Sequence, residues 1–254
     1  FKTKILVSQK TKKMEKKLTF KKGITDGLPI CIGYFSVALA FGVLAVQHGW
    51  PLWAPPLMSA TNLSGTGQFA AIDLLAAASG FIEIALATLI INARYFLMSV
   101  SLSQKLPEEI TFLQRLIIAI GNTDENFAVA MAQKNKLNFT YLIGLIMTSF
   151  SGWLGGTIFG TFAGNIVPEN VSSALGISLY AMFLAIIIPP SKESKAVLFT
   201  VLTSAIMSAF IYWLPSLSFI TSGWSIIICG ILSSAAAALL FPVKPDAGEE
   251  DFDE

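Results

Sequence analysis

Charge is what this sequence most conspicuously lacks. No charged side chain occurs from Ala196 to Val243, and only Glu169 is charged between Lys136 and Pro190. Over the whole chain 13% of residues are charged and 54% are hydrophobic, and the mean hydropathy is +0.68. These values exclude a soluble domain of this length. Because a membrane span needs roughly 20 consecutive apolar residues, the sequence indicates a polytopic membrane protein.

Histidine and cysteine are also scarce. His48 is the only histidine, which excludes zinc motifs and hydrolase sites that need several histidines. It precedes Trp50 in a turn that we expect outside the cytoplasm. Cys31 and Cys229 lie in apolar segments without metal-type spacing, so we expect both to be small buried hydrophobic residues.

The charges that are present gather at the two ends. Nine lysines lie between Lys2 and Lys22, which predicts a basic cytoplasmic leader over residues 1–22 rather than a nucleic-acid site. Met14 resembles a natural start, so we expect residues 1–13 not to be native and leave them out of the fold. Residues 23–243 are then a transmembrane permease domain, and residues 244–254 an acidic cytoplasmic tail.

Hydropathy predicts an all-α transmembrane helix bundle. Prolines and glycines fall in the expected connections between its apolar segments. The eight predicted segments are 28–47, 57–79, 81–104, 113–133, 139–163, 171–190, 195–214 and 224–242.

Lysine placement predicts the orientation of this bundle. If all eight segments cross, the lysines near 134, 192 and 244 join the leader in the cytoplasm. The alternative makes 57–79 a re-entrant hairpin and lays 113–133 along the surface, which leaves six spans. Both versions place the two termini in the cytoplasm. The pattern of segment starts at 28, 57, 81 and 113 recurs at 139, 171, 195 and 224, which suggests two four-segment halves, a repeat that transporters often show.

Small polar residues interrupt the second segment at Ser64-Gly-Thr-Gly-Gln-Phe69. Gly65 and Gly67 can break a helix near residues 64–68 and present backbone N–H groups, and half-helix N-termini bind substrate carboxylates in transporters. Thr66 and Gln68 add side-chain polar groups. The alternative is that the glycines only allow close helix packing.

A guanidinium lies roughly halfway along the third segment, in Asn92-Ala-Arg-Tyr95. Burying Arg94 in lipid is expensive unless it is paired or hydrated. It therefore binds a substrate carboxylate or forms an ion pair with one of four carboxylates, those of Asp73, Glu83, Asp124 and Glu125.

Two adjacent acids interrupt the fourth segment. Successive helical residues point about 100° apart, so Asp124 and Glu125 are not expected to share a partner. One could neutralise Arg94, and the other could bind a substrate ammonium group or a proton, since burial favours a protonated carboxylate. The alternative is a capped interfacial turn with two hydrated acids.

Glycines recur every four residues in the fifth segment. This spacing places them on one helix face, which predicts close helix packing within the chain or, alternatively, a partner interface. The glycines are Gly152, Gly156, Gly160 and Gly164.

In these motifs the chain resembles the AzlC family, the large subunit of branched-chain amino acid exporters, over roughly residues 20–243. Thr66, Gly67 and Tyr95 depart from the family's Ala, Ser and His. The matching stretches are Asp26-Gly-Leu-Pro, Ala40-Phe-Gly42, Gly65-Thr-Gly-Gln-Phe69, Asn92-Ala-Arg-Tyr95, Thr123-Asp-Glu-Asn-Phe-Ala128, Trp153 with Gly156-Thr and Gly160, and Ala174-Leu-Gly176.

The resemblance implies export of branched-chain or related hydrophobic amino acids across a bacterial inner membrane, together with a small AzlD-type membrane subunit. No Walker A loop is present, so we expect a secondary transporter, coupled to protons, without cofactor or metal. The resemblance also favours a functional role for Arg94, Asp124 and Glu125. We hypothesise that the Gly65–Gln68 amides, Asn92 and Arg94 bind the substrate carboxylate. Asp124 or Glu125 would serve its ammonium group or the coupling proton, and Phe69 would contact its side chain.

Two other functions are possible. An intramembrane enzyme would need a nucleophile–base pair or a metal-ligand set, and the sequence contains neither. A non-transporting scaffold or sensor subunit of a larger complex fits the sequence better than an enzyme does, and it is the alternative to a transporter.

Overall fold

The computed structural model describes residues 18–164, 166–168, 170–171, 184, 187–217 and 219–242, and within them it is helical, as the sequence predicts. Five of its helices are long and apolar enough to cross a membrane: α2 (Phe20–Gln47), α5 (Phe81–Gln104), α8 (Phe139–Ala163), α10 (Lys195–Trp213) and α11 (Ser222–Leu240). The predicted polytopic helix bundle is therefore confirmed. Most of the predicted leader, the 171–190 segment and the tail lie outside the described residues.

Two of the predicted segments form broken helices. The second consists of α3 (Ala54–Thr61) and α4 (Gly65–Ala76), and the fourth consists of α6 (Phe112–Ile120) and α7 (Asp124–Met131). At the first break, the side chain of Asn62 accepts a hydrogen bond from the Ser64 amide, at 2.8 Å. At the second, the hydroxyl of Thr123 caps α7 by accepting from the Asn126 amide. Short polar side chains thus replace the backbone bonds that a continuous helix would make.

The described residues divide into two compact units. The first lies within Phe1–Phe69 and Asn92–Gly176, and the second within Ala70–Ile91 and Ile177–Glu254. The boundaries fall inside α4 and α5, so each of these helices contributes residues to both units.

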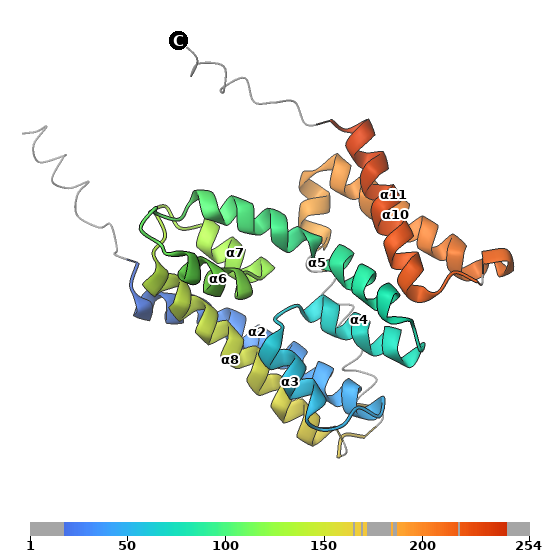
Figure 1. Cartoon of the computed structure of the whole chain (residues 1–254), viewed down its shortest axis with the longest axis horizontal. Helices are drawn as coiled ribbons and strands as arrows, with labels where there is room; N and C mark the ends of the chain where they lie inside the picture. Colours follow the sequence, from blue (N-terminus) through green and yellow to red (C-terminus); the bar gives the residue numbers. More distant parts are fainter. Residues whose placement is uncertain are drawn as a thin grey trace, which may run out of the picture. The chain divides into compact units, whose positions relative to one another are not determined.

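The first unit is built on two helices that lie side by side, α2 and α8 (Figure 1). Gly152, Gly156 and Gly160 of α8 lie against the backbone of α2, at Cys31, Phe35 and Leu39 respectively. A side-chain carbon at any of the three would collide with a carbonyl oxygen of α2. The glycine face of α8 is therefore occupied by a helix of the same chain.

The same packing is supported from α2 and from the end of α8. Gly42 meets the backbone of Thr157 and Thr161, and Gly164 lies close to Val43 and Val46. Close backbone approach of this kind is typical of membrane helices, where small residues allow extensive van der Waals contact.

Short helices complete the first unit. α3, α6 and α7 pack on α8, and α2 also contacts α3 and α7. A cluster of buried side chains, including Ile118, Leu137 and Leu145, joins α6 and α8. These contacts hold the α7 N-terminus against the α2–α8 pair.

The second unit is held together by α10 packed on α11 and by a small apolar cluster of Leu74, Ala87 and Ile227. Glu83, in the first turn of α5, accepts a hydrogen bond from the Gly223 amide at 3.0 Å and another from the Thr221 hydroxyl. A carboxylate therefore satisfies the N-terminus of α11, the end of a helix that favours negative charge.

Candidate substrate site at the breaks of two helices

Arg94 connects the first turns of two half-helices. Its Nη1 lies 3.0 Å from Oδ2 of Asp124, the first residue of α7, and its Nη2 donates to Oγ1 of Thr66 in α4 at 3.1 Å. The guanidinium carbon also lies 5.1 Å from the centre of the Tyr95 ring. The ion pair thus selects Asp124 from the four carboxylates that the sequence left open.

This ion pair is only partly buried. The side chain of Arg94 is 32% exposed and that of Asp124 is 29% exposed, whereas Arg94 Nε is buried and has no hydrogen-bond partner among the described residues. Neither charge is fully enclosed by the described residues, and the guanidinium retains an unused donor. Because Arg94 also contacts Thr66 at the start of α4, this ion pair links the two helix breaks.

The first turn of α4 offers further donors beside Arg94. The Ser64 hydroxyl accepts from the Gly67 amide at 3.2 Å and donates to Oδ1 of Asn92. No described residue accepts from the N–H groups of Gly65 and Thr66. Free amides at a helix N-terminus, next to a guanidinium, form an arrangement that favours a carboxylate.

The two adjacent acids of α7 point to different partners, as the helical angle between them predicts. Asp124 faces Arg94, whereas Glu125 accepts a hydrogen bond from the hydroxyl of Tyr34 in α2. The Tyr34 oxygen also lies 2.7 Å from Thr123 Oγ1. Because a phenol has one proton, donating it to Glu125 leaves Thr123 to donate to Tyr34.

Tyr34 is fixed by the scaffold of the first unit. It is 8% exposed, and its ring packs edge-on against Trp153 of α8 at a centroid distance of 5.4 Å. Glu125 is therefore positioned by a rigid aromatic side chain, and within the described residues it forms no ion pair.

Two predicted substrate contacts are instead directed into the protein. Gln68 is 0% exposed, accepts from Ser59 and donates to the carbonyl of Asn62. Phe69 is 4% exposed and packs edge-on against Phe41. In this conformation both side chains pack inside the protein next to the helix break, and their contact with substrate stays a prediction.

The structure therefore brings together Thr66, Asn92, Arg94 and Asp124, while it turns Gln68, Phe69 and Glu125 towards other neighbours. Ser64 belongs to the polar motif that the sequence shows in the second segment, but it was not predicted as a binding residue, and Tyr34 was missed. The one signal in the sequence that could have identified Tyr34 is its polar hydroxyl within a long apolar segment. Among the described residues, no group of three or more His, Cys, Asp or Glu side chains could hold a metal ion.

Comparisons with known proteins agree with the resemblance seen in the motifs. The profile of the family described as AzlC protein matches residues 29–167. An uncharacterized membrane protein of Archaeoglobus fulgidus is 34% identical over 181 residues, which cover 70% of this chain and 79% of that protein.

Two named relatives are more distant. The inner membrane protein YgaZ of Escherichia coli is 29% identical over 228 residues, 87% of this chain and 91% of its own. The branched-chain amino acid transport protein AzlC of Bacillus subtilis is 24% identical over 181 residues, 69% of each chain. No solved structure matches the chain significantly. The chain is a membrane protein that belongs to the AzlC family.

Proposed function

We propose that this protein is a secondary transporter that exports branched-chain or related hydrophobic amino acids, coupled to protons. The observation that carries the proposal is the Arg94–Asp124 pair, which lies where α4 and α7 both begin. A relative named as a branched-chain amino acid transport protein supports the substrate class.

The pair is complementary to an amino acid zwitterion. A substrate carboxylate can take the place of Asp124 on Arg94 and gain the free amides of Gly65 and Thr66. The substrate ammonium group then pairs with the released Asp124 carboxylate. Each protein charge exchanges one partner for another, so binding leaves no buried charge unpaired.

Glu125 is the better candidate for the coupling proton. It has no cation partner among the described residues, and Tyr34 fixes its carboxylate without neutralising it. A proton can therefore bind Glu125 without breaking the Arg94–Asp124 pair. The two acids then have separate tasks, one for the solute and one for the proton.

The remaining parts of the proposal concern the cellular setting. We propose a bacterial inner membrane location with both termini in the cytoplasm, because the lysine-rich connections then lie inside. We also propose a small AzlD-type subunit as partner. The five long apolar helices support a multi-pass arrangement.

Export in cells is the first test. Cells that express the protein and receive valine- or leucine-containing dipeptides should release the free amino acid and accumulate less of it internally. Unchanged accumulation in cells that contain the protein and its partner would count against an exporter and in favour of a scaffold or sensor.

Substrate analogues test the binding mode in reconstituted vesicles, with and without the small subunit. Unlabelled valine should compete with labelled valine for counterflow. Valine methyl ester lacks the carboxylate and N-acetylvaline lacks the ammonium group, so each should compete at least about tenfold more weakly, the equivalent of one lost charge-assisted contact. Equal competition by either analogue would contradict recognition of both charges.

A further inference from the structure

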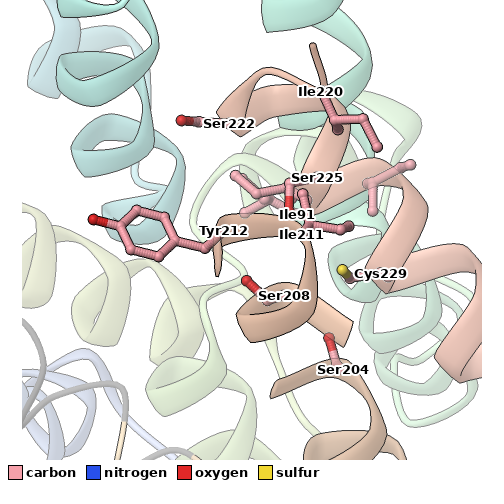
Figure 2. A pocket seen from close by; sticks show the side chains of 12 residues that line it. Ile91, Ser204, Ser208, Ile211, Tyr212, Ile220, Ser222, Ser225 and Cys229 are labelled. Atoms are coloured by element: carbon pink, nitrogen blue, oxygen red, sulfur yellow. The ribbon is translucent and has the colours of Figure 1, made fainter. Parts of the chain in front are cut away.

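The second unit contains a cavity that the proposed site does not use. Its volume is about 650 Å³, and residues of α5, α10 and α11 line it (Figure 2). One water molecule occupies roughly 30 Å³ in the liquid, so the cavity is large enough for many. None of its lining residues is charged.

Most of the residues that line the cavity lie on one face of α10 and one face of α11. On α10 the lining residues are spaced by four, three and one, and on α11 by three, one, three and one, so each set forms a single helical stripe. The α10 stripe consists of Ser204, Ser208, Ile211 and Tyr212, and the α11 stripe of Ser222, Ser225, Ile226, Cys229 and Gly230.

The cavity extends from the middle of these helices to one end of them. Ser204 and Cys229 lie near the midpoints of α10 and α11, and Ile220 lies in the connection between the two helices. At a rise of 1.5 Å per residue, Ser204 is about 14 Å from the end of α10 at Trp213, roughly half the thickness of a bilayer core.

The serine hydroxyls in this cavity have no hydrogen-bond partner among the described residues. Thr200 of α10 donates to the carbonyl four residues earlier at 2.9 Å, and Ser233 of α11 does so at 2.5 Å. By contrast, the described part of the chain offers no hydrogen bond to the hydroxyls of Ser204, Ser208, Ser222 and Ser225. In hydrocarbon an unpaired hydroxyl is costly, so such groups are expected to face water or a polar ligand.

We propose that this cavity is a water-filled vestibule that admits water and small polar solutes from the α10–α11 connection to the middle of the membrane. Water supplies the partners that the four hydroxyls lack, and isoleucines form the intervening wall. A lipid chain would fill the space but leave the hydroxyls unpaired. This inference does not depend on which solute the protein transports.

Substituted cysteines test the vestibule directly. In full-length protein carrying Cys31→Ser and Cys229→Ser, Ser204→Cys and Ser208→Cys report on the cavity. Leu202→Cys and Ile206→Cys are the matched controls, since both side chains lie on α10 outside the cavity lining and are more than half exposed. The probe is a charged, water-soluble methanethiosulfonate, which reacts with the thiolate that forms only in water.

The two serine positions should react at least about tenfold faster than the two control positions, because only a hydrated thiol ionises readily. After denaturation in detergent a maleimide must label all four variants, which shows that each thiol is present, and elution of each undenatured variant as a single peak in size-exclusion chromatography shows that it is folded. Native Cys229, tested in the Cys31→Ser protein, should also react with the water-soluble reagent. Equal rates at the serine and control positions, or labelling of the serine positions only after denaturation, would overturn the proposal.

Discussion

The role proposed for Arg94 rests on the two residues that it contacts, and its position within an apolar helix would not be enough to assign it. It bonds to Thr66 at the start of one half-helix and to Asp124 at the start of another. The cost of holding a guanidinium among apolar residues is reduced by these partners and by partial exposure. The same contacts leave both charges available for exchange with a zwitterion.

Substitution of the two acids should separate solute binding from proton coupling. Glu125→Gln should retain valine counterflow, which needs no net proton movement, but should lose valine export against a gradient. Asp124→Asn should lose both activities, because the ammonium partner is gone. Labelled valine fluxes and an internal pH dye measure the two properties in the same vesicles.

Loss of proton coupling in Asp124→Asn with coupling intact in Glu125→Gln would reverse the assignment of the two acids. A wild-type protein that moves no valine at all would instead refute the transport function itself. The two failures are therefore distinguishable.

Tyr34→Phe tests whether Tyr34 positions Glu125. The hydroxyl donates to the Glu125 carboxylate, so its removal leaves that carboxylate without the contact that holds it beside α2. Valine export against a gradient should fall at least about tenfold, the equivalent of one lost charge-assisted contact. Counterflow should persist, and export at the wild-type rate would show that Tyr34 is only a packing residue.

At the scale of helices, the glycine face of α8 explains how α2 and α8 lie so close together. The packing relies on backbone atoms, so it tolerates no added side chain at Gly152, Gly156 or Gly160. This pair of helices carries Tyr34 and supports α7, and the geometry of the acids depends on it.

Gly156→Ala and Gly155→Ala form a matched pair that tests this packing. A methyl group at Gly156 collides with the Phe35 carbonyl, whereas at Gly155 its nearest neighbour is a ring carbon of Phe35 at 4.0 Å. Gly156→Ala should destabilise the protein by about 1–3 kcal/mol, as overpacking does. Thermal unfolding in detergent should show a lower midpoint for Gly156→Ala and little change for Gly155→Ala; equal midpoints would contradict the packing.

How much the sequence could predict is clearest at the helix breaks. The glycines at 65 and 67 predict a break near residues 64–68, and the structure ends α3 at Thr61 and begins α4 at Gly65. At 121–123 a capped turn was an alternative that the sequence left open, and the structure ends α6 at Ile120 and begins α7 at Asp124. There the Thr123 cap outweighs the continuity of the apolar pattern.

Partner choice could not be predicted, since it depends on contacts distant in sequence. The local sequence pattern shows that Arg94, Asp124 and Glu125 are charges that are costly to bury in lipid. It does not show that Arg94 pairs with Asp124. Tyr34 lies far from Glu125 along the chain and meets it only because α2 packs beside α7. The inward direction of Gln68 was equally hidden, because its partners belong to α3 and the helix break.

At the scale of the whole molecule, the chain is a multi-pass member of the AzlC family. Its lysine placement predicts that both termini lie in the cytoplasm. A reporter that is active only in the cytoplasm should be active when fused to the C-terminus and inactive when inserted in the connection around Pro215. An inactive C-terminal fusion in stably expressed protein would contradict the proposed orientation.

The most direct test of the central claim is valine counterflow in vesicles containing the protein with Arg94→Ala, Arg94→Lys or no substitution. The wild type should exchange labelled valine, whereas both variants should reach the membrane, remain monodisperse and lose at least about tenfold in exchange, because lysine cannot contact Thr66 and a carboxylate in the same planar geometry. Exchange at the wild-type rate in Arg94→Ala would show that the Arg94–Asp124 pair does not bind the solute.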